Sequence, residues 1–125
     1  MATALFHKRP SNRGYATVDL STAADGVSSV IDISDLLLTS IQMPTAWTDA
    51  GLGFQGNVDG STNYYSVFTS SGDYLVLQTS ANRIVSFSPS QFANLQKLRL
   101  VSETTAGVAV AQASARVIKL GLFGG

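Results

Sequence analysis

Few side chains in this sequence could carry out acid, base or nucleophilic chemistry. The only histidine, His7, lies in a basic N-terminal stretch, and the chain has no cysteine. A serine nucleophile would need His7 as its base, because a hydroxyl reacts when a neighbouring group takes its proton. Glycosidases need two carboxylates flanking one bond, whereas the acids here are aspartates in turns and Glu103, which we expect at a solvated strand end. The residues therefore predict a protein that is not an enzyme and needs no cofactor.

Oxygen-bearing side chains gather in one short segment. Asn57, Asp59 and Ser61 alternate around Gly60, as in a calcium-binding loop. An EF-hand loop would also need a bidentate glutamate six residues after its glycine, where Ser66 stands. The same residue types form hairpin turns, in which an Asp-Gly pair supplies the positive φ angles. We therefore predict a tight turn at this position and no metal site.

Aromatic side chains could bind a ligand, because flat rings stack on sugars and anchor protein interfaces. Trp47 follows Pro44 in a loop, and Tyr64 lies just beyond the Asp59-Gly60 turn. Two interpretations stay open. Trp47 fills one end of the fold with its indole N–H bonded to a carbonyl, which we favour, or Trp47, Asp59 and Tyr64 form a carbohydrate-binding site.

The N-terminal stretch concentrates positive charge in a chain whose formal net charge is zero. Residues 1–14 contain Pro10 and Gly14 and no sustained periodicity, which predicts an extended arm ahead of one domain over residues 15–125. Its few fixed charges do not predict nucleic-acid binding. Apolar side chains accompany them and would be buried against a protein partner. The predicted partner contacts are Leu5, Phe6, Lys8, Arg9 and Arg13.

The composition also favours a surface covered by other proteins. Of the 125 residues, 45% are hydrophobic and 13% are charged, about half the usual charged fraction of about 25%. Uncharged polar side chains suit an interface, because a charge buried there needs a partner. The start lacks the pattern of a signal peptide, and no apolar run approaches the roughly 18 residues of a membrane helix. We expect synthesis in the host cytoplasm and no membrane partner.

Short alternating apolar segments, separated by turn residues, predict an all-β fold. In residues 36–43 the pattern places Leu37, Thr39, Ile41 and Met43 on one side, and in residues 97–102 it places Leu98 and Leu100 inward. Ser88 and Pro89 predict a capped helical turn over residues 88–92. Further strands are expected over residues 15–20, 27–33, 52–55, 63–69, 74–79, 83–87 and 115–122.

The segment 104–114 is either a loop or a weak strand. A helix over residues 106–115 could compete because of its alanines, but its valines and Gly107 argue against one. The number and spacing of the strands favour an antiparallel β-sandwich that is jelly-roll-like, with an extended N-terminal arm.

Several short motifs resemble a family of small structural proteins of tailed phages and prophages. The most specific is Met43-Pro44-x-x-Trp47-Thr48-x-Ala50. The other elements are Asp19-Leu20-Ser21, Phe54-Gln55, Asp59-Gly60 and Lys97-Leu98-Arg99-Leu100, with Gln112 and Arg116. The resemblance covers about residues 19–120. The order of these elements is also similar to the galactose-binding or discoidin-type jelly roll.

The resemblance implies a non-enzymatic virion structural protein, most concretely a capsid decoration or cement protein on the surface of a phage head. Its expected partners are the major capsid protein and other copies of itself, with a trimer as one form. The arm would reach across to a neighbouring subunit. The alternative that the jelly-roll likeness implies is a carbohydrate-binding adhesion module on a phage tail, fibre or head surface.

Overall fold

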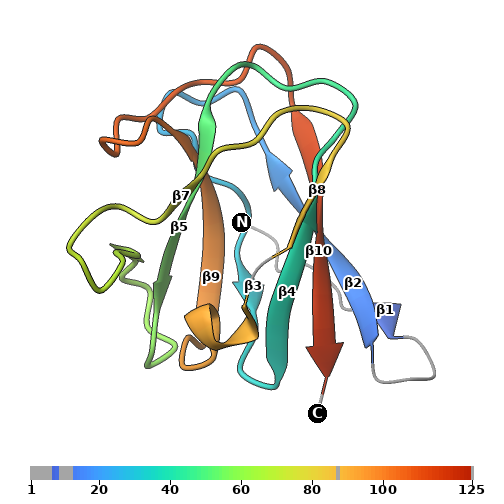
Figure 1. Cartoon of the computed structure of the whole chain (residues 1–125), viewed down its shortest axis with the longest axis vertical. Coiled ribbons are helices and arrows are strands. Elements are labelled where there is room, and N and C mark those ends of the chain that lie inside the picture. Colours follow the sequence, from blue (N-terminus) through green and yellow to red (C-terminus); the bar gives the residue numbers. More distant parts are fainter. Residues whose placement is uncertain (1–6, 9–12, 87, 125) are drawn as a thin grey trace.

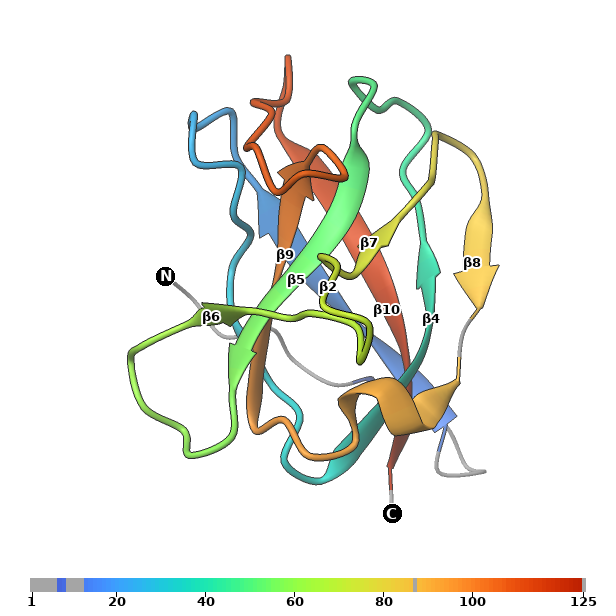
Figure 2. The ribbon, with the colours of Figure 1, turned by 60° about the vertical axis from the view of Figure 1, so that its left-hand side comes forward.

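The computed structural model describes residues 7–8, 13–86 and 88–124 and arranges them as two facing antiparallel sheets (Figures 1 and 2). Sheet A contains, in spatial order, β1 (His7–Lys8), β2 (Arg13–Leu20), β10 (Arg116–Gly124), β4 (Leu36–Gln42) and β8 (Ile84–Ser86). Sheet B contains β3 (Ile31–Asp32), β9 (Lys97–Glu103), β5 (Gly51–Asn57) and β6 (Tyr65–Ser66), and β7 (Val76–Leu77) also pairs with β5. The predicted all-β antiparallel sandwich is confirmed.

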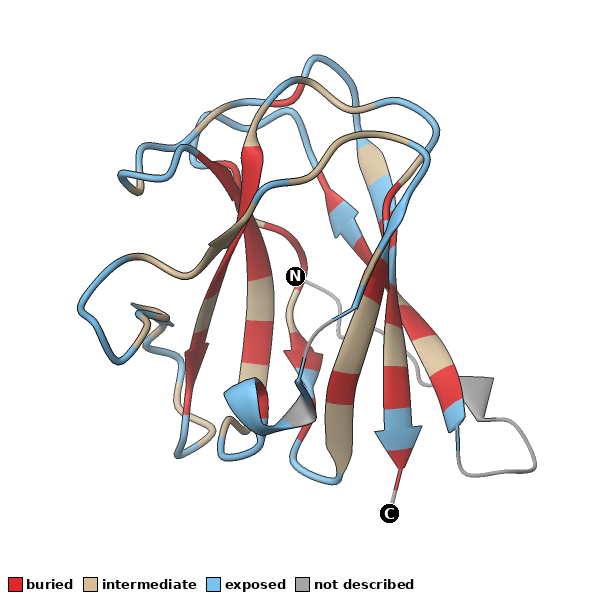
Figure 3. Cartoon of the chain, viewed as in Figure 1, coloured by how far each residue is buried: buried red, intermediate tan, exposed pale blue. Residues whose placement is uncertain are grey.

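The core lies between the sheets because alternate side chains of each long strand point inward. In Figure 3 the buried and less buried residues alternate along β2 and β10. Leu98 and Leu100 are fully buried, as predicted. At one end, Phe92 of the 3-10 helix η1 (Pro89–Phe92) packs on Phe54, with ring centroids 4.6 Å apart. The helical turn was predicted, but the Ser88 side chain does not cap it: the Ser88 hydroxyl is hydrogen-bonded to that of Ser90 at 2.9 Å.

Strand β4 departs from the predicted alternation because it contains a β-bulge. Gly121 pairs with Ser40, but the next residue, Leu122, pairs with Leu38, so Thr39 has no opposite residue on β10. The extra residue shifts the two halves of β4 by one position. Leu38 and Ile41 therefore both face the core and are fully buried, whereas strict alternation had placed Leu38 on the opposite side from Ile41.

Several predicted strands are shorter than expected. Residues 27–33 form only β3 and two isolated bridges, because the Ser28 hydroxyl accepts the backbone N–H of Leu100 at 2.8 Å in place of a ladder bond. Residues 104–114 form a loop in which Gly107 has φ +79°. None of the described residues forms a helix long and apolar enough to cross a lipid bilayer.

The N-terminal residues that are described belong to sheet A. Strand β2 begins at Arg13, two residues before the predicted domain start, and β1 pairs with it through His7 opposite Tyr15 and Lys8 opposite Gly14. Strand β1 is the edge strand of sheet A on the side away from β8. Residues 1–6 and 9–12 of the predicted arm lie outside the described residues.

Candidate binding surfaces

His7 lies in the edge strand β1, where its backbone pairs with Tyr15. Within residues 7–8, 13–86 and 88–124, no three histidine or acidic side chains are placed to hold a metal ion. The polar side chains that do contact one another in the network around Thr48 are uncharged except for Arg116, and they connect loops.

The loop before β5 is tied to the segment before β10 by a hydrogen-bond network around Thr48. The Thr48 backbone N–H donates to Gln112 Oε1 at 2.8 Å, and Gln112 Nε2 donates to the Thr48 carbonyl at 3.2 Å and to Ser102 Oγ at 2.9 Å. Arg116 donates through Nε to Gln112 Oε1 at 3.0 Å and through Nη2 to Thr48 Oγ1 at 3.2 Å. Gln112 is 2% exposed. These motif residues therefore join two distant segments and are not free for a ligand.

Trp47 closes the same end of the sandwich. Its indole Nε1–H donates to the Ala50 carbonyl at 3.0 Å, and its half-buried ring packs against the core. Strand β5 begins after this loop and runs seven residues to Asn57 before the Asp59-Gly60 turn. At about 3.3 Å per residue, the two features are separated by roughly 20 Å. The structure does not bring Trp47 together with the other predicted carbohydrate contacts, Asp59 and Tyr64.

The Asp59-Gly60 turn uses its polar side chains for its own backbone. Asn57, 5% exposed, donates through Nδ2 to the carbonyls of Ser61 and Asn63 at 3.0 and 3.1 Å and accepts the Gly60 N–H at 3.0 Å. The backbone N–H of Ser61 donates to Asp59 Oδ1 at 3.0 Å, and this hydrogen bond lowers the pKa of the Asp59 carboxyl. Gly60 has φ +73°. These contacts match the predicted tight turn.

A hollow of about 290 Å³ lies beside this turn, between Asp59, Leu95 and Tyr65. The ring of Tyr65 is 66% exposed. Tyr64 is engaged elsewhere: the Arg99 guanidinium carbon lies 4.4 Å from its ring centroid, and Arg99 Nε donates to Gln55 Oε1 at 2.9 Å. Tyr64, which was predicted to contact a carbohydrate, thus packs on Arg99 of strand β9 in sheet B.

Glu103 is buried, and the prediction that it is a solvated strand end is wrong. Its side chain lies against Gly53 of β5, where a Cβ atom would stand 2.6 Å from the carboxyl carbon, and it is 3% exposed. Oε2 has no hydrogen-bond partner among the described residues. Burial raises the pKa of this carboxyl. The isolated bridge from Glu103 to Ala109 folds the 104–114 loop back on the strand end, which explains the burial.

The outward side of sheet A is an exposed surface that carries few charges. We call it the outer face of sheet A and define it by the outward residues of four strands. These are Arg13, Tyr15, Thr17 and Asp19 of β2, Val117, Lys119, Gly121 and Phe123 of β10, Leu37, Ser40 and Gln42 of β4, and Ile84 and Ser86 of β8.

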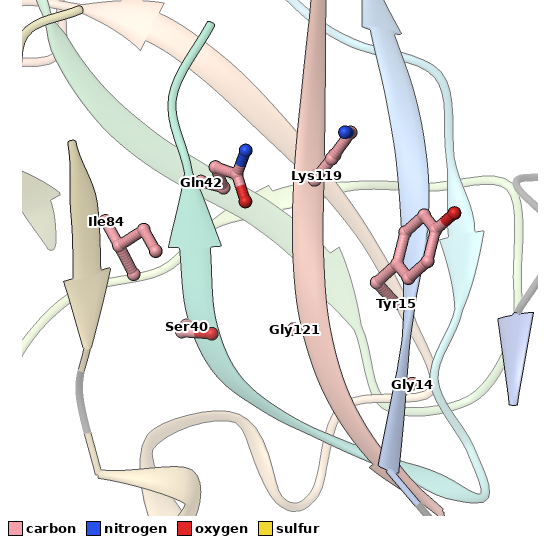
Figure 4. Close-up of a pocket in the computed structure, with 7 residues that line it drawn as sticks. All are labelled: Gly14, Tyr15, Ser40, Gln42, Ile84, Lys119 and Gly121. Carbon is pink, nitrogen blue, oxygen red and sulfur yellow. The ribbon is translucent and has the colours of Figure 1, made fainter. Parts of the chain in front are cut away.

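Apolar side chains stand exposed around shallow hollows on this face. Ile84 is 64%, Val117 52% and Phe123 42% exposed. Two adjoining hollows of about 380 and 420 Å³ share Gly121 and Ser40, and Figure 4 shows the residues that line the first of them. A Cβ atom at residue 121 would overlap the Ser40 hydroxyl, so the Ser40 side chain leans over this glycine.

The predicted partner contacts are divided by the structure. Leu5, Phe6 and Arg9 lie outside the described residues, and Lys8 lies in β1. Arg13 is exposed at the start of β2 on the outer face of sheet A. Sequence reasoning missed the other residues of this face. Their alternation is visible in residues 115–122, but strand neighbours cannot be read from one strand's pattern.

Comparisons with solved structures find partial likenesses at low identity. The capsid of Ralstonia phage GP4 matches with 12% identity and a TM-score of 0.49, over 100% of this chain and 92% of that chain. The CBM32-1 module of a Clostridium perfringens family 31 glycoside hydrolase matches with 13% identity and a TM-score of 0.36, over 92% and 87%. An F5/8 type C domain from Bacteroides fragilis matches with 9% identity and a TM-score of 0.38, over 92% and 72%. No protein-family model and no curated protein sequence matches the chain. The function is therefore argued from the side chains.

Proposed function

We propose that this chain is a virion structural protein, a decoration or cement protein that stabilises a phage head through protein–protein contacts. The observation that carries the proposal is the outer face of sheet A, which exposes Ile84, Val117 and Phe123 beside only three charged side chains. Contact with another protein removes such apolar surface from water at little desolvation cost.

The fold supports this role by presenting the face on rigid strands. Strand β10 is paired along its length with β2 on one side and β4 on the other. The Thr48 network holds the loops at one end, so few groups would have to be ordered on binding. A preorganised surface binds with a smaller loss of conformational entropy.

The N-terminal arm supplies the second contact in this proposal. Strand β1, which contains Lys8, lies at one edge of sheet A. Leu5 and Phe6 offer apolar surface, and Lys8 and Arg9 offer positive charge. We propose that these residues of the arm contact the major capsid protein.

Binding to heads tests the proposal. Heads of the phage that encodes the chain, purified without this protein, are incubated with the wild type or with a variant lacking residues 1–12, and occupancy is measured by quantitative gel analysis. We expect the deletion to abolish binding while circular dichroism shows a folded domain, because β2 keeps its pairing with β10.

A charge-reversed variant, Lys8→Glu with Arg9→Glu, should also bind weakly, whereas Lys97→Glu, a charge reversal on sheet B outside the arm and the outer face of sheet A, should bind as the wild type does. Full occupancy by the deletion variant would reject the role of the arm. Failure of the wild type to bind heads would reject the function itself.

A further inference from the structure

The outer face of sheet A is organised in rows that cross the strands, and the rows differ in side-chain size. Registers align Tyr15, Gly121, Ser40 and Ser86 in one row, and Thr17, Lys119, Gln42 and Ile84 in the next. Arg13 and Phe123 lie in the row before these, and Asp19 and Val117 lie in the row after. The face thus has two central rows and one row on either side.

Each strand contributes one large and one small side chain to the central rows. Strand β10 offers Lys119 and Gly121, β4 offers Gln42 and Ser40, and β8 offers Ile84 and Ser86. On β2 the order is reversed, with Tyr15 in the row of small residues and Thr17 in the row of large ones. A twofold axis between the central rows and perpendicular to the strands would place every large side chain of one copy over the small one of the other.

The outer rows are complementary under the same axis. Arg13 of one copy would face Asp19 of the second, and Asp19 would face Arg13, so opposite charges meet twice. Phe123 would face Val117, which joins the exposed apolar side chains of β10. An isologous interface requires this kind of self-complementarity. If one residue contacts a second residue of the other copy, the second residue also contacts the first across the axis.

We propose that two copies of this chain associate through the outer faces of their A sheets, with strands antiparallel across a twofold axis. The inference rests on the proposed function in that it names the protein that covers this face. It favours a pair over the trimer considered from the sequence. Facing sheets cross at about 30°, so the match is best near the axis, where Lys119 would lie over Gly121 and the small Ser40 side chain beside it.

The size of the face predicts a weak pair. Its 13 outward residues, on strands about 4.8 Å apart and about 7 Å apart along each strand, cover roughly 440 Å² of sheet per copy. This is below the surface of about 800 Å² per partner that stable complexes bury. We expect a dissociation constant of about 10–500 µM for the pair, and stronger association when many copies are held on one particle.

Sedimentation equilibrium from about 5 to about 1,000 µM tests the pairing. The wild type should fit a monomer–dimer equilibrium. Arg13→Asp and Asp19→Arg, both at exposed positions, should each weaken the pair at least about tenfold, because each puts like charges opposite one another twice. An equimolar mixture of these two variants should recover a heterodimer of near wild-type affinity. Ser86→Trp should abolish the pair by filling the space that faces Ile84.

The matched control is Asp73→Arg, an exposed charge reversal on a loop outside this face, which should pair as the wild type does. A wild type that stays monomeric, that forms a trimer, or whose dimer survives all three face variants would overturn the inference. Full head binding by a strictly monomeric protein would overturn the pairing alone. A dimer that does not bind heads would instead overturn the capsid proposal.

Discussion

At the scale of single residues, the buried polar side chains have unequal partners. Asn57 and Gln112 bond backbone groups that would otherwise lack partners, so each stabilises a loop. Glu103 is equally buried, but one of its carboxylate oxygens has no hydrogen-bond partner among the described residues. A carboxylate held this way favours its protonated form, because burial disfavours charge.

The first prediction concerns the dependence of stability on pH at Glu103. Its pKa in the folded state is raised above the usual 4.5, so the unfolded chain loses this proton first as pH rises. The contribution of this group to stability is therefore complete below about pH 4 and is lost as pH rises through the raised pKa. Glu103→Gln should have a higher free energy of unfolding at pH 7, by about 1–2 kcal/mol, with little difference at pH 4.

Urea unfolding of both proteins between pH 4 and pH 8 measures this difference, and because other groups titrate equally in both, the variant minus wild-type value isolates Glu103. A difference that does not change with pH would contradict the prediction.

At the scale of elements, the protein depends on contacts between segments that are distant in sequence. The Thr48 network joins the loop before β5 to the segment before β10. Gly53 of β5 leaves room for Glu103 of β9, and the bulge in β4 turns both Leu38 and Ile41 into the core. Each of these adjustments depends on the neighbouring strand and not on local propensity.

The second prediction concerns Gln112. Gln112→Ala would leave the Thr48 N–H and carbonyl without their side-chain partner and remove one acceptor of Arg116. We expect a loss of about 2–4 kcal/mol in the free energy of unfolding, since buried polar groups lose their partners together. Thermal and urea unfolding measure it, with the exposed Gln78→Ala as a control that should change stability by less than about 0.5 kcal/mol. Equal stabilities of the two variants would contradict the structural role of the network.

At the scale of the whole molecule, we expect stability to be distributed unevenly within each sheet. Strand β10 is flanked by two long partners, whereas β6, β7 and β8 are short and each pairs along two or three residues. Opening of short edge segments breaks fewer contacts than opening of the centre of a sheet.

Hydrogen exchange should reflect this difference. In dilute protein, where pairing is absent, amides of β10 and of the β5–β9 pair should exchange at least about tenfold more slowly than those of residues 64–86. Mass spectrometry of peptic fragments measures the rates. Uniform protection across both regions would contradict the expected distribution. At high concentration, slower exchange of the backbone amides of β8 and β10 would agree with the proposed pair.

The alternating patterns were sufficient to predict the class of fold, most strand positions and the Asp59-Gly60 turn, because inward and outward residues and turn chemistry are local properties. They could not predict the β4 bulge or the burial of Glu103, since both depend on which segment lies opposite. The same reason explains the candidate surface. The sequence indicated that residues 115–122 alternate and that few residues are charged. Only the tertiary structure set Lys119 in one row with Gln42 and Ile84, because strand order and register bring together residues that are far apart in the chain.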